Sequence, residues 1–204
     1  MAKISYALIV TLCVVGGLAR VLVNNQAHLK THVDTLGPDE APQEILHETP
    51  LEPEATLFLC TFEQHACGMR NQKNTRSRFK RRSATLAGKP GYHMVVDAQK
   101  AGYNVARLIT PYMPVYANTT ACVAILYVVN GTGADRLEIV AQDSANRPLL
   151  TLKNGTSKWN HAQKSLNVTQ DVRFFISAYT KSKAEGVIAI DNFTFNLMPC
   201  KNEK

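Results

Sequence analysis

The chain has 204 residues, of which 45% are hydrophobic and 19% charged, and its formal net charge is +7. This length and apolar share allow one ordinary packed domain, and they exclude a disordered chain and a collagen-like or coiled-coil fibre. The charge is uneven, because residues 20–56 contain two bases and seven acids whereas residues 57–204 contain twenty bases and nine acids, so an acidic arm precedes a basic body.

Residues 1–19 have the pattern of a secretory signal peptide. Lys3 precedes an uncharged run from Ile4 to Ala19, and small residues occupy the −3 and −1 positions of a cleavage site after Ala19. An uncleaved membrane anchor is the alternative, but the run is short for a span and Arg20 follows it directly. We therefore predict a secreted, extracellular protein with no membrane span after signal cleavage.

Residues 20–56 form the acidic arm, which repeats Glu without an apolar period and contains Pro42, Pro50 and Pro53. A segment of this composition cannot bury enough apolar surface to fold by itself. We predict a solvated spacer; the alternative is a propeptide that lies on the basic body until it is removed.

From Leu57 onward, short runs of Val, Ile, Phe, Tyr and Thr are separated by Gly, Asn and Pro, a spacing typical of many short strands. Apolar alternation predicts strands with one buried face at 136–141 and 172–179. The run 122–129 is apolar throughout, which predicts a central strand covered on both faces.

Turn signals complete this pattern. Asn130-Gly131 and Asn154-Gly155 are dipeptides typical of hairpin turns, and no long amphipathic helix is predicted. The expected fold class is therefore an all-β antiparallel sandwich over residues 57–200, followed by a short tail at 201–204.

Four cysteines remain after the signal peptide, which contains Cys13, is removed. They are Cys60, Cys67, Cys122 and Cys200. An even count in a secreted chain favours two disulfides, and these residues alone leave three pairings open. A zinc site is the rival interpretation, but no C-x-x-C pair or histidine at ligand spacing supports it.

The sequence also contains five Asn-x-Ser/Thr acceptor motifs for N-glycosylation. Their asparagines are Asn118, Asn130, Asn154, Asn167 and Asn192. Four of them have turn-like polar surroundings, which suits a glycosylated surface, whereas the neighbours of Asn192 indicate a strand.

Several motifs resemble, in order and approximate spacing, those of the MAM domain family, named from meprins, neuropilin-type receptors and receptor tyrosine phosphatases. They are Cys60-Thr-Phe-Glu63, Cys67-Gly68, Gly91-Tyr-His-Met-Val-Val-Asp97, Ala106-Arg-Leu-Ile-Thr-Pro111, Trp159 and Gly186-Val-Ile-Ala-Ile-Asp-Asn192, with Cys200 at the end. The resemblance implies a jelly-roll-like β-sandwich used for adhesion or for holding protein partners, without catalysis. It also implies that Cys60 pairs with Cys67 and Cys122 with Cys200.

Some members of this family bind calcium through acidic residues, and Glu63 and Asp191 match that pattern. The family's second aspartate is replaced by Asn192, and its Asp-His-Thr stretch is replaced by residues 85–90. Calcium takes six to eight oxygen ligands, so this ligand set is short. We expect no cofactor beyond a weakly bound calcium ion.

A basic stretch replaces the acidic or neutral stretch that the family usually has at this place. Its bases are Arg70, Lys73, Arg76, Arg78, Lys80, Arg81 and Arg82, with no acid between Glu63 and Asp97. Charge of this density stays in water or meets an anion, so we predict a solvated loop or edge, anchored by Phe79, that binds a polyanion. Two alternatives remain: a charged face without a specific partner, and a furin-type processing site at 78–81.

No catalytic motif is present, since the chain lacks an H-E-x-x-H pair, a G-x-S-x-G elbow and a Gly-rich phosphate loop. Trp159 is predicted to pack in the core rather than to bind a ligand. Two functions remain: an adhesion module for an extracellular protein, which could be a second copy of this chain, and a protein that binds sulfated glycosaminoglycan. Secretion favours sulfated sugar over nucleic acid as the polyanion.

Overall fold

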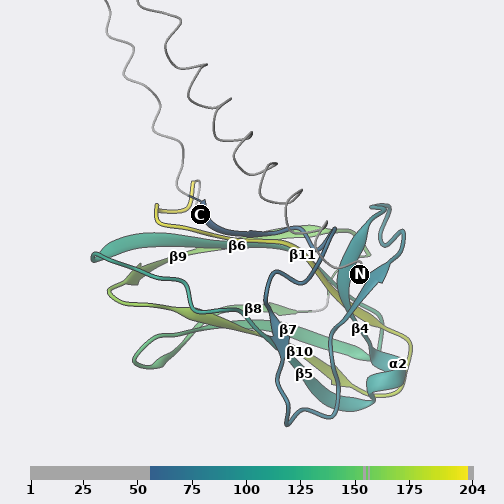
Figure 1. Cartoon of the computed structure of the whole chain (residues 1–204). Helices are drawn as coiled ribbons and strands as arrows, with labels where there is room; N and C mark the ends of the chain where they lie inside the picture. The colour runs from purple at the N-terminus through teal and green to yellow at the C-terminus, as the bar shows by residue number, and fades with distance from the viewer. Residues whose placement is uncertain (1–55, 154, 156, 202–204) are drawn as a thin grey trace, which may run out of the picture. The chain divides into compact units, whose positions relative to one another are not determined.

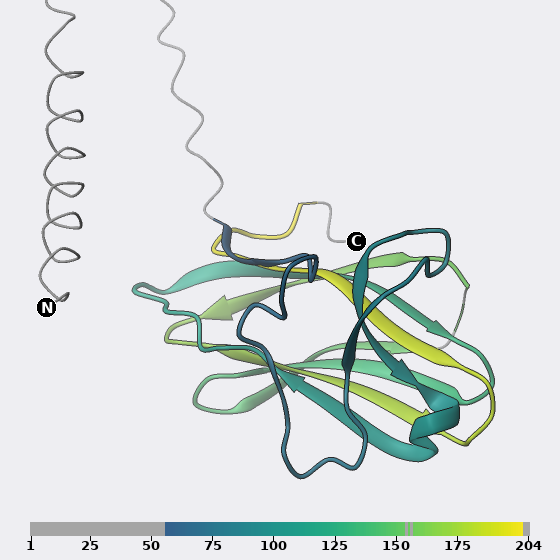
Figure 2. The same ribbon diagram turned by 45° about the vertical axis from the view of Figure 1, so that its right-hand side comes forward.

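The computed structural model describes residues 56–153, 155 and 157–201. Two antiparallel sheets pack face to face as two layers (Figures 1 and 2), which confirms the predicted sandwich. The six-stranded sheet has the order β3 (Lys80–Ser83), β4 (Tyr92–Asp97), β11 (Val187–Asn196), β6 (Thr119–Asn130) and β9 (Asn160–Val168), and β1 (Thr56–Cys60) also pairs with β11. The five-stranded sheet has the order β2 (Arg70–Asn71), β5 (Tyr103–Ile109), β10 (Arg173–Lys181), β7 (Ala134–Gln142) and β8 (Asn146–Lys153).

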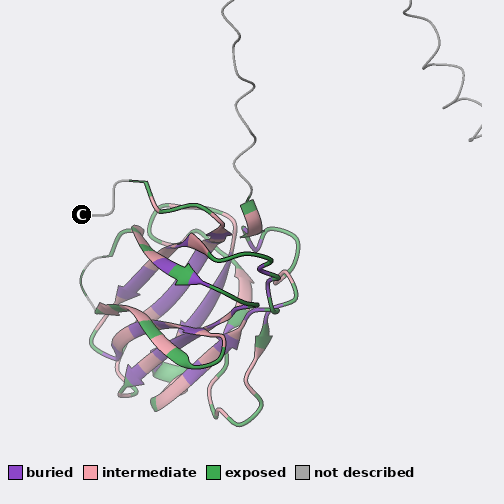
Figure 3. Cartoon of the chain, turned by 90° about the vertical axis from the view of Figure 1, so that its left-hand side faces the viewer, coloured by how far each residue is buried: buried purple, intermediate pink, exposed green. Residues whose placement is uncertain are grey.

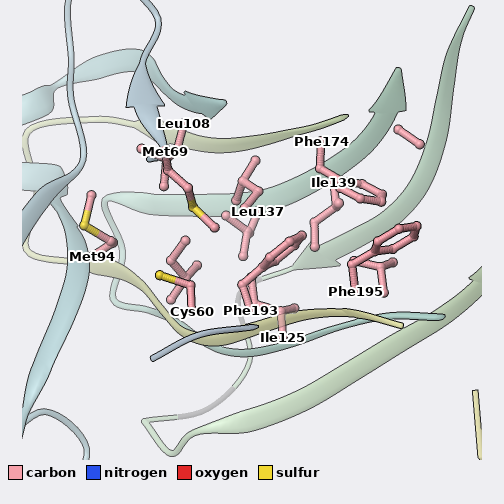
Figure 4. Close-up of a cluster of buried hydrophobic side chains, with 14 of the residues drawn as sticks. Cys60, Met69, Met94, Leu108, Ile125, Leu137, Ile139, Phe174, Phe193 and Phe195 are labelled. Atoms are coloured by element: carbon pink, nitrogen blue, oxygen red, sulfur yellow. The ribbon is translucent and has the colours of Figure 1, made fainter. Parts of the chain in front are cut away.

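The core lies between the two sheets, where Figure 3 shows the buried parts of the strands. Alternate residues of β10 and β7 point inward, and the predicted buried faces at 172–179 and 136–141 are confirmed. Phe174 of β10 lies 5.6 Å from Phe193 and 5.2 Å from Phe195 of β11, measured between ring centroids (Figure 4). Each such buried ring contributes about 1.5–3 kcal/mol relative to an exposed one, so these contacts hold the sheets together.

Strand β6 lies between β11 and β9, as expected for a central strand. Its inward residues Val123 and Ile125 are fully buried in the main core. The prediction that both faces are covered holds at the two ends of the run, because Cys122 and Val128 are buried on the outer face, whereas Ala124 and Leu126 between them remain half-buried. The disulfide to Cys200 lies at one end, and the cluster of Leu86 and Trp159 packs at the other.

Strand β11 changes its neighbour along one edge. Its residues 187–190 pair with β4, and its residues 193–196 pair with β1. At the change, Asn192 has a φ of 43° and the ladder to β6 contains a bulge. Asn tolerates this left-handed conformation better than most residues do, so the sequence suits the irregularity.

The predicted turn at Asn130-Gly131 is confirmed, since it connects β6 to β7. Gly131 has a φ of 90°, and a Cβ atom there would lie 2.5 Å from the Cα atom of Gly186. Only glycine fits both constraints, and the turn can therefore lie directly against residues 185–186. The predicted turn at 154–155 falls partly outside the described residues.

Two disulfides join Cys60 to Cys67 and Cys122 to Cys200, as the resemblance implied. The pairs are 7 and 78 residues apart in sequence. By the loop-entropy model, these closures contribute about 2.5 and 4.5 kcal/mol to the free energy of unfolding.

The helix α2 (Ala98–Ala101) is short, and no helix among the described residues is long and apolar enough to cross a membrane.

Candidate anion-binding site

The basic stretch is divided between the two sheets. Arg70 lies on β2, opposite Ile109 of the five-stranded sheet, whereas residues 80–83 form β3 at the edge of the six-stranded sheet. Lys73 is exposed in the connection between them. The stretch is therefore two short edge strands and a loop rather than one flexible segment.

Phe79 anchors the stretch, as the sequence predicted, and only 2% of it is exposed. The side chain of Asn71 makes hydrogen bonds to both the amide and the carbonyl of Phe79. The Phe79 amide donates to Asn71 Oδ1 at 2.8 Å, and Asn71 Nδ2 donates to the Phe79 carbonyl at 3.0 Å. These bonds fix the backbone beside Arg78 and Lys80.

The register of β3 separates its basic side chains. Directly opposite residues of an antiparallel pair share one face. Lys80 lies opposite Val95 and faces outward, whereas Arg81 lies opposite the core residue Met94. Arg82 shares the outward face with Lys80, because side chains alternate along a strand.

Arg81 makes structural contacts that the sequence did not reveal. Its Nε atom donates to the Phe62 carbonyl at 2.7 Å, and its Nη2 atom donates to the Glu63 carbonyl at 2.6 Å. Its guanidinium also lies 3.7 Å from the centroid of the Tyr92 ring. The structure thus separates Arg81 from the other residues predicted to bind a polyanion.

A pocket of about 300 Å³ collects most of the remaining bases. We call it the basic pocket, and its charged lining residues are Arg76, Arg78, Lys80, Arg82, Lys100 and Asp97. Lys100 comes from α2, whose first turn is capped by the Asp97 carboxylate. Asp97 lies 3.5 Å from Lys100 Nζ, so one carboxylate faces five cations. Sequence reasoning missed Lys100 because only the fold brings α2 beside the loop.

The same geometry opposes the furin-type processing interpretation. The bond after Arg81 lies inside β3, which is paired with β4 through residues 80–83. A processing protease needs an exposed, extended loop, and a paired strand does not offer one.

The residues of the expected cation site have separate partners. The Glu63 carboxylate accepts a hydrogen bond from the Tyr92 amide, at 3.3 Å to each oxygen. Asp191 is buried and pairs with the Lys89 ammonium and with His93 Nδ1, which lies 3.1 Å away. The part of the chain that the structure describes holds no group of three or more His, Cys, Asp or Glu side chains placed to bind a metal ion. A lysine ammonium at Asp191 does not fit a calcium ligand set.

Asp191 belongs to a polar cluster on the outer face of the six-stranded sheet. His93 Nε2 lies 3.2 Å from the Lys89 carbonyl, and the His93 ring lies 4.9 Å from the Trp159 ring. Trp159 Nε1 donates to the Leu86 carbonyl at 2.7 Å. Trp159 thus packs against the protein, but on this outer face rather than between the sheets. The cluster fixes the turn at residues 86–89 over Val95, Val128 and Ala189.

A second pocket of about 650 Å³ opens on the same face. We call it the turn pocket, because the β6–β7 turn lines it. Its lining residues are Arg82, Ala84, Leu86, Val95, Asp97, Gln99, Asn130, Gly131, Thr132, Glu185, Gly186 and Val187. It shares Arg82, Val95 and Asp97 with the basic pocket, so the two pockets adjoin.

Four of the predicted glycosylation sites lie among the described residues, and Asn154 lies outside them. Asn118 and Asn167 are exposed, next to β6 and on β9, and Asn130 ends β6. Asn192 is half-buried at the bulge of β11, in line with the strand that its neighbours indicated. The strands of the five-stranded sheet carry none of the four.

The outer face of that sheet combines arginines with aromatic rings. Arg107 and Arg173 lie 5.5 and 5.2 Å from the centroid of the Phe175 ring, and Arg173 also lies 4.6 Å from the Tyr112 ring. Both arginines bond only to neutral groups in the described part of the chain: Arg107 to Ser177 and Gln72, and Arg173 to Gln142.

A family model described as "MAM domain, meprin/A5/mu" matches residues 60–201. The chain belongs to the MAM domain family. MAM domains are extracellular, non-catalytic modules, which agrees with the two disulfides and with the sandwich described above. The comparison with curated proteins found no match.

Several solved structures share the sandwich fold of this MAM domain at low sequence identity. The CBM22-1–GH10 modules of xylanase 10B from Clostridium thermocellum, complexed with xylohexaose, match with a TM-score of 0.50 and 14% identity over 73% of this chain and 29% of that one. The CBM22-1 xylan-binding domain of Paenibacillus barcinonensis Xyn10C matches with a TM-score of 0.48 and 13% identity, over 72% of this chain and 96% of that one. The K1 cleaved adhesin domain of Lys-gingipain from Porphyromonas gingivalis matches with a TM-score of 0.49 and 15% identity, over 68% of this chain and 96% of that one. At these identities the likeness concerns the fold alone.

Proposed function

We propose that this chain is a secreted, non-catalytic binding module whose basic pocket binds sulfated glycosaminoglycan. One observation carries the proposal: five cationic side chains surround a single pocket that holds one carboxylate. Cations gathered around one pocket repel one another, and a bound polyanion reduces this repulsion. Its binding also releases the counterions that surround the polyanion, which favours association. The extracellular character of MAM domains supports a sulfated sugar as the polyanion.

The chemistry of the pocket suits sulfate groups. Arg76, Arg78 and Arg82 carry planar guanidinium groups, which bind tetrahedral oxyanions with two parallel hydrogen bonds. Lys80 and Lys100 add two further positive charges to the lining. Because β3 is an edge strand, an extended chain can lie along it without displacing another strand.

The test compares two triple variants that each remove three positive charges. The pocket variant carries Arg78→Ser, Lys80→Ser and Arg82→Ser, and the control variant carries Lys153→Ser, Lys181→Ser and Lys183→Ser at exposed positions outside the pocket. Each protein is eluted by salt from heparin and from a sulfonate resin of similar charge density.

We expect wild type and control to leave heparin at higher salt than the sulfonate resin, and the pocket variant to lose this difference. The difference should shrink because counterion release falls with each lost contact. The proposal is wrong if wild type leaves both columns at the same salt, or if both variants behave alike.

A second candidate function is the binding of an extracellular protein at the outer face of the five-stranded sheet. Arginine and aromatic side chains are enriched at protein interfaces, and Arg107 and Arg173 have no carboxylate partner among the described residues. The partner should therefore present carboxylates. Selection of phage-displayed peptides should enrich acidic sequences whose binding is lost in Arg107→Ser/Arg173→Ser and kept in the pocket variant; equal loss in both variants would contradict this candidate.

A further inference from the structure

The turn pocket contains a complete acceptor motif for N-glycosylation. Asn130, Gly131 and Thr132 form the motif Asn-x-Thr, and all three residues line the pocket. We propose that an N-linked glycan on Asn130 packs its first sugar residues into this pocket, so that the glycan is a structural part of the outer face.

The direction of the Asn130 side chain supports this proposal. Asn130 lies opposite Val187 in the β6–β11 ladder, and directly opposite residues share a face. Val187 packs against the outer-face cluster and lines the pocket, so the Asn130 amide points to the same side. The amide makes no hydrogen bond to any other residue that the structure describes, and a sugar on Nδ2 therefore displaces no hydrogen bond among these residues.

The size and lining of the pocket suit a sugar. Its volume of about 650 Å³ lies within the range of about 300–1,000 Å³ found for pockets that hold small ligands. Leu86, Val95 and Val187 give an apolar surface for an acetyl methyl group and for the C–H faces of a pyranose. Gln99 and Glu185 are exposed polar groups at the pocket, where sugar hydroxyls can bond to them.

The placement leaves the basic pocket open. The two pockets share Arg82, Val95 and Asp97, but Arg76 and Lys80 line only the basic pocket. A glycan on Asn130 would therefore form one wall of the polyanion site rather than cover it. The inference does not depend on polyanion binding.

Asn118 provides the matched control. It also heads an Asn-x-Thr motif and adjoins β6, but it lies beyond the other end of the strand, is exposed, and lines neither pocket. A glycan there lies outside both pockets.

The test uses the full chain secreted from eukaryotic cells, with the occupancy of each motif measured by glycopeptide mass spectrometry. Under native conditions, peptide N-glycosidase should release the Asn130 glycan about tenfold more slowly than the Asn118 glycan, because release requires local opening of the pocket. Hydrogen exchange at residues 84–87 and 185–187 should accelerate in Asn130→Gln and Thr132→Ala.

Thr132→Ser keeps the motif and the hydroxyl that donates to the Glu185 carbonyl. Hydrogen exchange at residues 84–87 and 185–187 should therefore stay unchanged in Thr132→Ser, and also in Asn118→Gln. Agreement between Asn130→Gln and Thr132→Ala shows that the glycan, not the hydroxyl, gives the protection. An unoccupied Asn130, equal release rates at the two sites, or unchanged exchange after loss of the motif would each overturn the proposal.

Discussion

The ammonium of Lys89 pairs with the carboxylate of Asp191, whose side chain is only 1% exposed. Burying a carboxylate costs free energy unless a positive charge or a metal ion pairs with it. In this MAM domain Lys89, in the turn at 86–89, supplies that charge, and His93 Nδ1 lies 3.1 Å from the same carboxylate. The ion pair therefore ties the turn at 86–89 to β11, next to the point where β11 changes its pairing partner from β4 to β1.

Removing the ammonium should destabilise the fold strongly. In Lys89→Met the Asp191 carboxylate loses its main partner, and such losses cost about 3–5 kcal/mol of unfolding free energy. The double variant Lys89→Met/Asp191→Asn should recover much of this loss. Urea unfolding of the two single variants and the double variant measures the coupling.

The control for this cycle is the exposed pair of Lys100 and Asp97, whose side chains are 70% and 28% exposed. Lys100→Met should change the unfolding free energy by less than about 1 kcal/mol, because solvent screens the pair. Equal effects of Lys89→Met and Lys100→Met would contradict the role given to the buried pair.

Calcium should have little effect on the stability of the domain. The Lys89 ammonium already contacts Asp191, and Glu63 bonds to the Tyr92 amide. A ligand that binds only the native state raises its stability by RT ln(1 + [L]/Kd). The thermal midpoint should therefore be the same in millimolar calcium and in chelator, with magnesium as the control; a rise of several degrees in calcium alone would show a site that these contacts do not predict.

Arg81 and Arg82 are neighbours in sequence but should respond differently to substitution. Arg81→Lys loses the forked donation to two carbonyls and the stacking on Tyr92, which should cost about 1–3 kcal/mol of unfolding free energy. Arg82→Lys keeps the outward charge and should be nearly neutral. Chemical denaturation of both variants tests this, and a larger loss for Arg82→Lys would refute the assignment of faces.

Much of the fold follows from local patterns in the sequence. The alternation at 136–141 and 172–179 predicted strands and their buried faces, because a period of two repeats within a few residues. The family order of the cysteines implied both disulfide pairs. Phe79 was recognisable as an anchor since it is an isolated apolar residue between bases.

The features that were missed depend on contacts between distant residues. The bonds of Arg81 go to carbonyls about 18 residues away, and Lys89 meets Asp191 across 102 residues. Neither partner can be read from the neighbouring sequence. Lys100 was missed for the same reason, because α2 reaches the basic pocket only through the path of the chain between β4 and β5. The charge of the site was predictable, but its geometry was not.

The ionisation of Asp143 should make stability depend on pH. Burial opposes ionisation of this carboxyl, but the Ala145 amide and the Arg147 guanidinium outweigh it and hold the pKa of Asp143 below its usual value. A lowered pKa in the folded state contributes stability that is present above the unfolded pKa of about 3.9 and is lost as the pH falls through the folded value.

Asp143→Asn should therefore reduce the unfolding free energy by about 1–2 kcal/mol near neutral pH. The difference from wild type should decrease in acid, and urea unfolding at several pH values measures it. A difference that grows as the pH falls would contradict this sign.

The position of β11 has a consequence for biosynthesis. This strand lies between β4 and β6 and also pairs with β1. These three strands are synthesised earlier, and they cannot complete their sheet until residues 187–196 are available. Ribosomes add residues from the N-terminus, and long-range pairing of this kind folds slowly. Until Asn196 has emerged, the open edges of β4 and β6 are available to other chains. The nascent domain should therefore need chaperones until β11 has emerged from the ribosome.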